Sequence, residues 1–181
     1  MFLSKIKSIQ YFIISISFFL IDQLSKFLIT KKFSIHTNGA WETTDHLDRI
    51  VIIDPILIFK RIDNKGIAFG IDGDGTLSYI ITPLTIMLTI AIIIYLYKNS
   101  KKKNAKIRCL ALSLILGGAL GNLFDRIFFG GVVDFIGLFE NIFPYIFNFA
   151  DTFITIGMIM LLFSDLFIKK KKNEKQTNKN F

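Results

Sequence analysis

The chain has 181 residues, of which 52% are hydrophobic, and its mean hydropathy is +0.52. This length allows one compact unit, not two large ones, and the hydropathy is high for a soluble domain. The formal net charge is +8. Most of the surplus lies in short clusters beside apolar runs, which is typical of a membrane protein and not of a nucleic-acid-binding surface. The single cysteine, Cys109, excludes an internal disulfide and a paired-cysteine metal or redox site.

The first apolar run follows a short basic start. Lys5 and Lys7 precede it, and the pattern is similar to a secretory signal peptide that has no small-residue cleavage site. We therefore expect residues 8–30 to form an uncleaved transmembrane helix, long enough to cross about 30 Å of hydrocarbon. Asp22 and Lys26 interrupt the run. Because they are four residues apart, they share a helical face and could form an ion pair.

Residues 31–76 are the main segment outside the membrane. Within it, residues 50–60 are rich in β-branched side chains but contain Pro55, which predicts short strands broken by a turn or bulge. Asn64-Lys65-Gly66 is a turn signal. We expect a small sheet resting on the membrane, too small to stand alone. Asp72–Gly75 is similar to the start of a calcium loop but lacks the later glycine and glutamate, and we expect no metal or cofactor.

Three further apolar runs and the basic residues between them predict the membrane topology. The runs span residues 77–97, 107–126 and 148–168. Six Lys or Arg lie at 98–108, six Lys lie in the tail from Lys169, and two precede the first run. Basic residues gather on the cytoplasmic side, so four spans place both termini there and both larger loops outside. We expect one membrane domain, 1–168, and a disordered cytoplasmic tail, 169–181.

Ionised and amide side chains concentrate between the third and fourth apolar runs. They are Asn122, Asp125, Arg126, Asp134, Asn148 and Asp151. The first three share one face of a helix, and the last two share a face of the next helix. Charges this close to hydrocarbon are costly and indicate function by default. If the two runs pack as a hairpin, these polar groups face each other near one membrane surface.

Asp134 and Asp151 are the candidates for a catalytic pair, because each lies in an apolar context, VVDFI and FNFAD. Two nearby carboxylates in a low dielectric cannot both ionise at little cost, so the pair can share a proton. One carboxylate then activates water, and the other polarises the scissile carbonyl and protonates the amine. The spacing leaves two alternatives open: a transport or proton path, and structural ion pairs that close a helix hairpin.

Four sequence blocks in order resemble the lipoprotein signal peptidase family, also called signal peptidase II. They are DQLSK at 22–26, NKGIAFG at 64–70, GNLFDR at 121–126 with VVDFI at 132–136, and FNFAD at 147–151. The resemblance covers nearly the whole chain. It implies an intramembrane aspartyl endopeptidase that cleaves signal peptides from diacylglyceryl-modified prolipoproteins, just before the lipidated cysteine. It also implies an all-α fold of four transmembrane helices, with a small β-cradle after the first and a mobile interfacial segment between the third and fourth.

The family motifs also assign roles to residues. Asp134 and Asp151 correspond to the catalytic dyad, and Asp125 has a supporting role. Eight residues match positions that shape the site or hold substrate: Asp22, Lys26, Asn64, Gly66, Asn122, Arg126, Asn148 and Ala150. We expect a monomer in the bacterial cytoplasmic (inner) membrane, with its site near the extracytoplasmic face. Its expected partners are prolipoproteins and membrane lipids, with no nucleic acid and no metal.

One departure from the family pattern is visible. The stretch from Asp22 to Asn64 is longer than usual, and HTNGAWETTDHLD at 36–48 is the insertion. Two other classes remain as alternatives, a small transporter or proton-conducting membrane protein and a non-enzymatic assembly factor. A transporter is expected to place its acids near mid-span or to show repeat symmetry, whereas these acids cluster at one interface.

Overall fold

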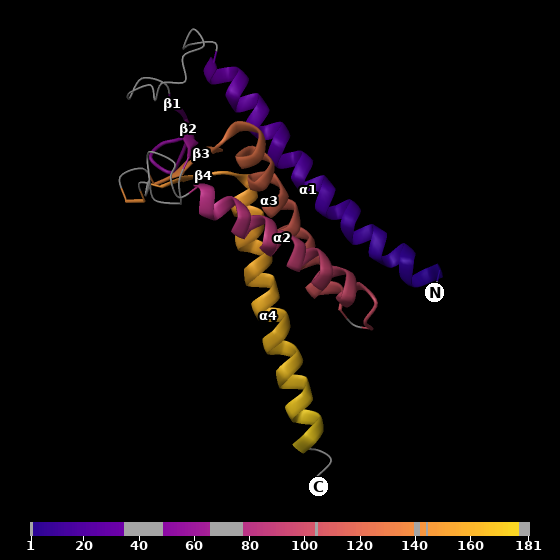
Figure 1. The fold of residues 1–181 in the computed structure, drawn as a ribbon. Helices are drawn as coiled ribbons and strands as arrows, with labels where there is room; N and C mark the ends of the chain where they lie inside the picture. The colour runs from indigo at the N-terminus through magenta and orange to yellow at the C-terminus, as the bar shows by residue number, and fades with distance from the viewer. Residues whose placement is uncertain are drawn as a thin grey trace.

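The computed structural model describes residues 2–34, 49–65, 78–103, 105–139, 142–143 and 145–177. Within these ranges the chain forms helices and a small sheet at one end of them (Figure 1). The helices are α1 (Phe2–Ser34), α2 (Ser78–Ser100), α3 (Lys106–Phe129) and α4 (Phe149–Thr177). The strands are β1 (Arg49–Ile53), β2 (Leu57–Asn64), β3 (Val132–Leu138) and β4 (Ile146–Phe147).

The helices coincide with the predicted apolar runs. Three of them, α1 over Ser8–Phe33, α2 over Tyr79–Ser100 and α3, are long and apolar enough to cross a membrane. The apolar part of α4, Phe149–Ser164, is shorter. The expectation of a disordered tail from Lys169 is wrong as far as Thr177, because α4 continues to that residue. Lys, Glu and Gln are good helix formers, and neither Gly nor Pro interrupts this stretch.

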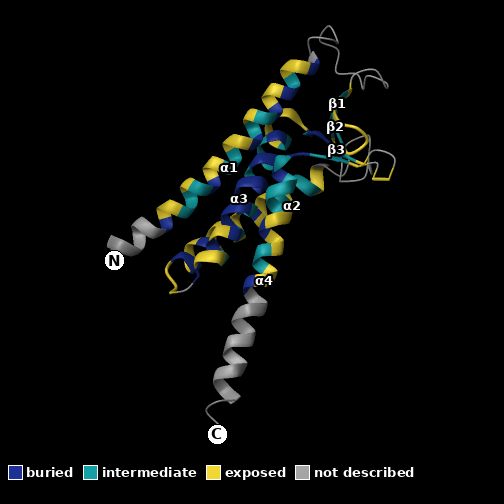
Figure 2. Cartoon of the chain, turned by 180° about the vertical axis from the view of Figure 1, so that it is seen from behind, coloured by how far each residue is buried: buried dark blue, intermediate teal, exposed yellow. Residues whose placement is uncertain are grey.

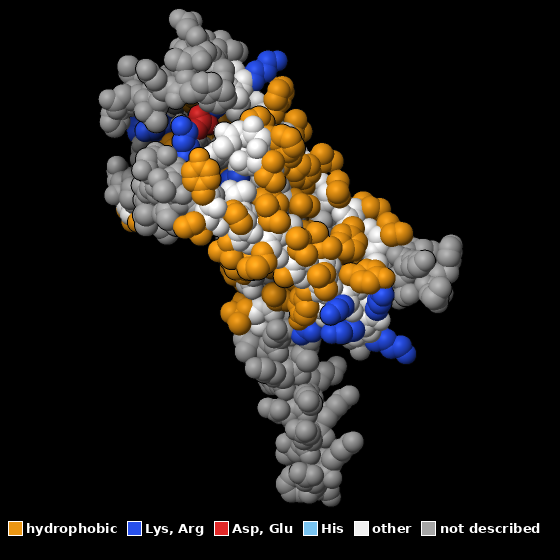
Figure 3. Space-filling model, in the orientation of Figure 1, with side chains coloured by type: hydrophobic (Ala, Val, Ile, Leu, Met, Phe, Trp, Pro, Cys, Tyr) orange, Lys and Arg blue, Asp and Glu red, His pale blue; other side chains and the backbone are white. Residues whose placement is uncertain are grey.

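Helix α3 is the centre of the helical part, since it packs against α1, α2 and α4. It is buried along much of its length, whereas the outward sides of α1 and α2 are exposed (Figure 2). Those exposed sides are covered with large apolar side chains (Figure 3). Apolar surface of this extent is typical of helices that face lipid. Lys and Arg side chains gather instead at the end where α2 and α3 are joined (Figure 3).

Two buried apolar clusters hold the fold at its two ends. The cluster near the α2–α3 connection consists of Leu96, Ala105, Cys109, Leu112 and Leu116. Cys109 is 1% exposed and packs in this cluster near the start of α3. The other cluster joins the end of α1 to the sheet and consists of Ile29, Phe33, Phe135 and Ile136. It fixes β3 against α1, and therefore fixes the position of the residues that β3 carries.

The antiparallel sheet has the order β1-β2-β3-β4. Strands β1 and β2 form a hairpin with a register shift between Val51 and Ile53, as the position of Pro55 predicts. The sequence placed the β-element only after the first helix, but β3 and β4 come from the segment between α3 and α4. That segment is therefore half of the sheet as well as a connection. The pairing of β3 with β2 supplies the backbone partners that its apolar run requires.

A glycine turn leads directly from α3 into β3. Helix α3 ends with Gly130 in the left-handed conformation, at φ 73°, and its N–H donates to Arg126 O at 3.2 Å. A residue with a Cβ is strained at this φ, so glycine suits the cap. The turn reverses the chain within two residues, and as a result Asp134 on β3 lies beside the end of the helix that carries Asp125.

Candidate active site

Asp134 lies on β3, opposite Ile62 of β2, and its side chain is buried. Its Oδ2 accepts a hydrogen bond from Asn64 Nδ2 at 3.0 Å, and its Oδ1 accepts one from Asn148 Nδ2 at 2.6 Å. Burial, assisted by the nearby charge of Asp151, raises the pKa of Asp134 from 3.8 to about 7. The hydrogen bonds from the two asparagines oppose this rise in pKa. Asp134 is therefore a carboxyl group that can hold or release a proton near neutral pH.

Asp151 lies in the first turn of α4, where a capping box holds it. Its backbone N–H donates to Asn148 Oδ1 at 2.9 Å, and Asn148 N–H donates to Asp151 Oδ2 at 3.3 Å. This reciprocal pairing between the cap residue and the third helical residue is the capping box, with Asp in the place of the more usual Glu. The amino end of a helix carries partial positive charge. Asp151 therefore lies at the electropositive end of α4.

Two asparagines connect the carboxylates. Asn148 Nδ2 donates to Asp134 Oδ1 and, at 3.2 Å, to Asn122 Oδ1. Asn122 Nδ2 donates in turn to Asp151 Oδ1 at 2.8 Å. The polar faces predicted for the third and fourth apolar runs thus do meet. Helices α3 and α4 can approach this closely because Gly118 has no side chain. A Cβ at this position would collide with the backbone oxygen of Ala150.

A second acid pair, Asp22 and Asp125, lies beside the first, and Lys26 bridges it. Lys26 Nζ is 2.8 Å from Asp22 Oδ2 and 2.8 Å from Asp125 Oδ2. The predicted ion pair between Asp22 and Lys26 is confirmed, and it is almost completely buried. Buried charges are tolerated in proteins when they are paired and hydrogen-bonded. This cluster satisfies both conditions.

The second acid pair also holds the backbone beside each candidate catalytic acid. Ala150 N–H, next to Asp151, donates to Asp22 Oδ1 at 2.9 Å. Val133 N–H, next to Asp134, donates to Asp125 Oδ2 at 3.4 Å. Asp125 therefore contacts the strand that carries Asp134, and its own carboxylate is occupied by Lys26.

Gln23 is a site residue that the sequence reasoning missed. Its Nε2 donates to Asp125 Oδ1 at 2.9 Å, to Asp22 Oδ2 at 3.2 Å and to Gly121 O at 3.2 Å. The one signal that could have found it was its place inside the DQLSK block. The amide adds neutral donors to two carboxylates that share a single ammonium group, so it lowers the cost of their burial.

The remaining predicted site residues are placed as follows. The structure brings together Asp22, Lys26, Asn64, Asn122, Asn148 and Ala150 around the two acid pairs. Arg126 Nη1 donates to Asn122 O at 3.4 Å, and its guanidinium interacts electrostatically with Asp151, Asp134 and Asp125. Gly66 lies outside the described residues.

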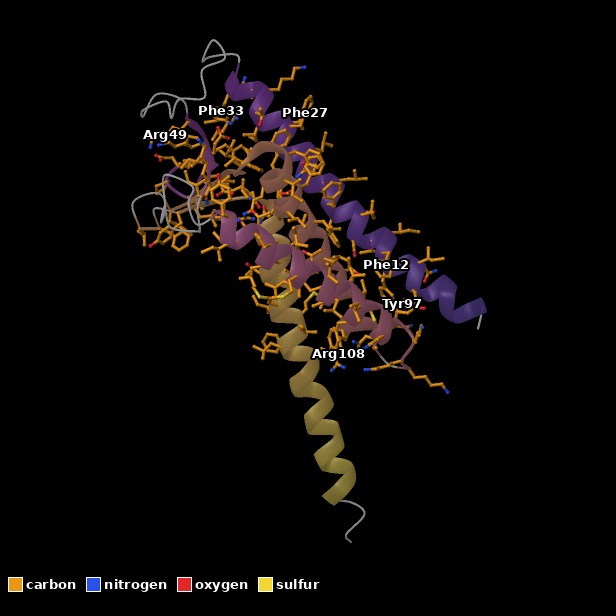
Figure 4. The ribbon with its side chains drawn as sticks, viewed as in Figure 1. Phe12, Phe27, Phe33, Arg49, Tyr97 and Arg108 are labelled. Carbon is orange, nitrogen blue, oxygen red and sulfur yellow. The ribbon has the colours of Figure 1, made fainter. Side chains whose placement is uncertain are left out.

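The site lies at the sheet end of the molecule, where α1, α3, α4 and β3 meet. Figure 4 places Phe33 and Arg49 at this end and Tyr97 and Arg108 at the opposite end of the helices. Within the part of the chain that the structure describes, no three His, Cys, Asp or Glu side chains form a group that could hold a metal ion. What the described residues do offer is a protonatable buried carboxyl beside a carboxylate at a helix amino end, which suits acid–base catalysis.

Comparison with known proteins gives one consistent family. The family model described as signal peptidase (SPase) II matches residues 14–167. A lipoprotein signal peptidase from Halalkalibacterium halodurans is 36% identical over 171 residues, which cover 93% of this chain and 98% of the relative. A lipoprotein signal peptidase from Fusobacterium nucleatum subsp. nucleatum is 29% identical over 168 residues, which cover 93% of each chain.

Two solved structures share the fold, and both are described as a bacterial membrane enzyme studied by the in meso method. The first, at 2.3 Å, gives a TM-score of 0.66 and 31% identity, and the match covers 90% of this chain and 91% of that one. The second, at 1.9 Å, gives 0.63 and 33%, and the match covers 87% and 92%. The arrangement of helices and sheet seen here is therefore similar to that of solved bacterial membrane enzymes.

Proposed function

The chain belongs to the signal peptidase II family, and on this premise we propose that Asp134 and Asp151 are its catalytic pair. Members of the family are proteases, and the activity of this chain is the removal of signal peptides from lipoproteins. The observation that carries the proposal is Asn148, which donates to Asp134 through its side chain and to Asp151 through its backbone. One residue thereby holds both carboxylates at a single place.

The environments of the two acids support different roles. Asp134, buried and with its pKa raised to about 7, is the proton carrier. Asp151, at the amino end of α4, is the base. Asp151 takes a proton from a water molecule as the water oxygen attacks the scissile carbonyl carbon, and Asp134 gives its proton to the carbonyl oxygen. Asp151 then protonates the leaving amine as the C–N bond breaks, and Asp134 regains its proton from a hydroxyl of the intermediate.

The proposed membrane placement uses four spans, with the apolar part of α4 as the fourth. Both termini lie in the cytoplasm, and the site lies near the extracytoplasmic face of the bacterial cytoplasmic membrane. The basic α2–α3 connection lies at the end of the helices opposite the sheet, which supports this orientation. Reporter fusions at Asn99 and after Lys169 should read cytoplasmic, and one near Gly39 external. An external reading at Asn99 would overturn the orientation.

The proposed substrate is a prolipoprotein whose cysteine already carries diacylglycerol, cleaved just before that cysteine by a monomeric enzyme. Large apolar side chains cover the outward sides of α1 and α2, so membrane lipid surrounds the enzyme and the acyl chains can share its bilayer. Burial of acyl chains is worth about 0.8 kcal/mol per CH₂. The two chains therefore fix the depth of the scissile bond relative to Asp134 and Asp151.

The test is cleavage of one precursor, with and without the diacylglyceryl group, by purified enzyme in the same detergent or bilayer. We expect the unmodified precursor to react about 100-fold more slowly even at saturation, since a 1 Å misplacement has an effect of this order. Equal rates would contradict the lipid-dependent substrate and favour a general signal-peptide protease. No cleavage of either precursor by folded enzyme would contradict the protease assignment itself.

A further inference from the structure

Lys26 contacts three acceptors, and one of them is not an acid. Its Nζ is 2.8 Å from a carboxylate oxygen of Asp22 and 2.8 Å from one of Asp125, and it donates to Asn122 Oδ1 at 3.1 Å. A lysine ammonium has three N–H groups and no acceptor. The three contacts therefore use all its donors, and the third ties the ion cluster to the amide that touches Asp151.

The amide of Asn122 has only one orientation that suits its neighbours. Its Oδ1 accepts from Lys26 and from Asn148 Nδ2, while its Nδ2 donates to Asp151 Oδ1 at 2.8 Å. If the amide turned by half a rotation, its NH₂ group would face two donors and its oxygen would face a carboxylate. Neither donor can become an acceptor. The amide of Asn148 is held by Asp151 N–H, which donates to Asn148 Oδ1 at 2.9 Å, and an ammonium group has no acceptor. Lys26 is therefore one of two fixed donors to Asn122 Oδ1, and it is the charged one.

We propose that Lys26 is a positioning residue for catalysis. By donating to Asn122 Oδ1 alongside Asn148 Nδ2, it holds the orientation of that amide, so that an N–H donor faces the proposed base, Asp151. The inference rests on the proposed function, because it assigns Lys26 a task only if Asp151 ionises during the reaction. Two other roles for Lys26 make different predictions: a through-space effect of its charge on the catalytic pair, and a purely structural pairing with Asp22 and Asp125.

The charged groups around Asp151 come from three elements. They are Asp22 and Lys26 on α1, Asp125 and Arg126 on α3, and Asp134 on β3. Lys26 lies among acids that offset its charge, whereas its hydrogen bond to Asn122 has no substitute among these groups. The orienting contact and the charge can therefore be separated by mutation.

The experiment is a double-mutant cycle with Lys26→Met, Asn122→Leu and the combination, read out as kcat/KM against pH on a lipid-modified precursor. The informative quantity is the midpoint pH of the acidic limb, the part of the profile where kcat/KM rises with pH as the base ionises. Loss of a hydrogen bond to a charged group should move this limb upward by about one to two pH units in each single variant. The combination should move it no further than Asn122→Leu does, because the orienting contact is already lost.

Two matched substitutions serve as controls. Lys32→Met removes a lysine from the exposed side of the same helix and should leave the acidic limb in place. Gln23→Met removes donors from Asp22 and Asp125 without a contact to Asn122, and should lower stability without moving the limb. A structural effect transmitted through the acid pair would appear in the Gln23 variant as well.

Three results would overturn the inference. Shifts of the acidic limb that add in the combined variant would mean that Lys26 acts through its charge. A Lys26→Met enzyme with an unmoved limb, or a limb that moves equally in Gln23→Met, would mean a structural role. If Lys26→Met does not fold, the cycle is run with Asp125→Asn added to every variant. Lys26→Met/Asp125→Asn keeps the net charge of the parent cluster, because it removes one positive and one negative charge. The same three results would then overturn the inference. Failure of the proposed function is distinct, since it would appear as cleavage retained in Asp151→Asn.

Discussion

The molecule contains two pairs of aspartates within one buried polar region, and they differ in what lies between them. Asp22 and Asp125 share the ammonium group of Lys26, at 2.8 Å from each. Asp134 and Asp151 share Asn148, which offers each of them a neutral N–H donor. One pair is bridged by a full positive charge, and the other is bridged by amides.

The difference shows why burial alone does not identify a reactive acid. Asp22 is 0% exposed and Asp125 is 1% exposed, whereas Asp134 is 4% exposed. The cation between the first two offsets their charges and ties them into the packing of α1 and α3. Neutral bridges leave the second pair with repulsion between like charges, which a shared proton relieves. We therefore assign structure to the first pair and chemistry to the second.

The largest effect on folding should follow from breaking the lysine-bridged pair. Asp125→Asn should lower the free energy of unfolding by about 3–5 kcal/mol, because it removes one partner from a buried ion cluster. Cleavage by the protein that remains folded should stay measurable. Thermal unfolding in detergent gives the first quantity and turnover per folded molecule gives the second. Unchanged stability would mean that the lysine bridge is not what holds this pair.

At the amide-bridged pair, we expect an effect on stability that depends on pH. Because burial raises the pKa of Asp134 from 3.8 to about 7, the folded protein holds a proton between these pH values that the unfolded chain has released. The stability that this group contributes is therefore full below about pH 4 and is lost as the pH rises to about 7. Asn cannot ionise, so the stability of the parent relative to Asp134→Asn should fall by up to about 4 kcal/mol between pH 4 and pH 8. The variant also has a cost that does not depend on pH, because both Asp134 oxygens accept hydrogen bonds and an NH₂ group would face one of these donors.

The measurement is the unfolding temperature of Asp134→Asn and of the parent at pH 4 and at pH 8. The stability of the parent relative to the variant should be lower at pH 8 than at pH 4. Asp125→Asn is the matched comparison, since it removes a buried carboxylate that pairs with Lys26 and should destabilise the protein. A stability difference that is the same at pH 4 and at pH 8 would mean that folded Asp134 does not hold its proton between these pH values.

A smaller effect should follow from moving α4 against α3. A Cβ at Gly118 would collide with Ala150 O, next to Asp151, so Gly118→Ala should cost about 1–3 kcal/mol and about tenfold or more in cleavage rate. Gly157→Ala is the control, because it crowds Ala111 and Ile115 between the same two helices. It should cost similar stability with a smaller loss of rate. Equal losses of rate would mean that the register of α4 does not position the pair.

The sequence predicted the features that depend on local periodicity. The apolar helices, the ion pair between Asp22 and Lys26, and the meeting of the polar faces that carry Asn122 and Asn148 all follow from helical spacing and agree with the structure. The assignment of Asp134 and Asp151 as the catalytic pair rests on their apolar sequence contexts and on the family motifs, and it is a proposal.

Features that depend on long-range pairing were not predictable in this way. The sequence did not indicate that β3 pairs with β2 and carries Asp134 into the sheet, because strand register is set by contacts distant in the chain. The contacts of Gln23 likewise depend on how closely α1 approaches Gly121. The capping box of Asn148 and Asp151 could have been found from the Asn-x-x-Asp spacing at the start of an apolar run.

The most direct test of the account compares Asp134→Asn, Asp151→Asn and Asp125→Asn in one cleavage assay, with the same lipid-modified precursor and detergent. Each variant is first shown by circular dichroism and size-exclusion chromatography to be folded. Loss of a general acid or base lowers the rate by about 10²–10⁴-fold, and the pair acts as a unit. The account predicts no detectable cleavage by the first two variants and measurable cleavage by the third. Folded Asp125→Asn without activity, beside active Asp134→Asn, would contradict it.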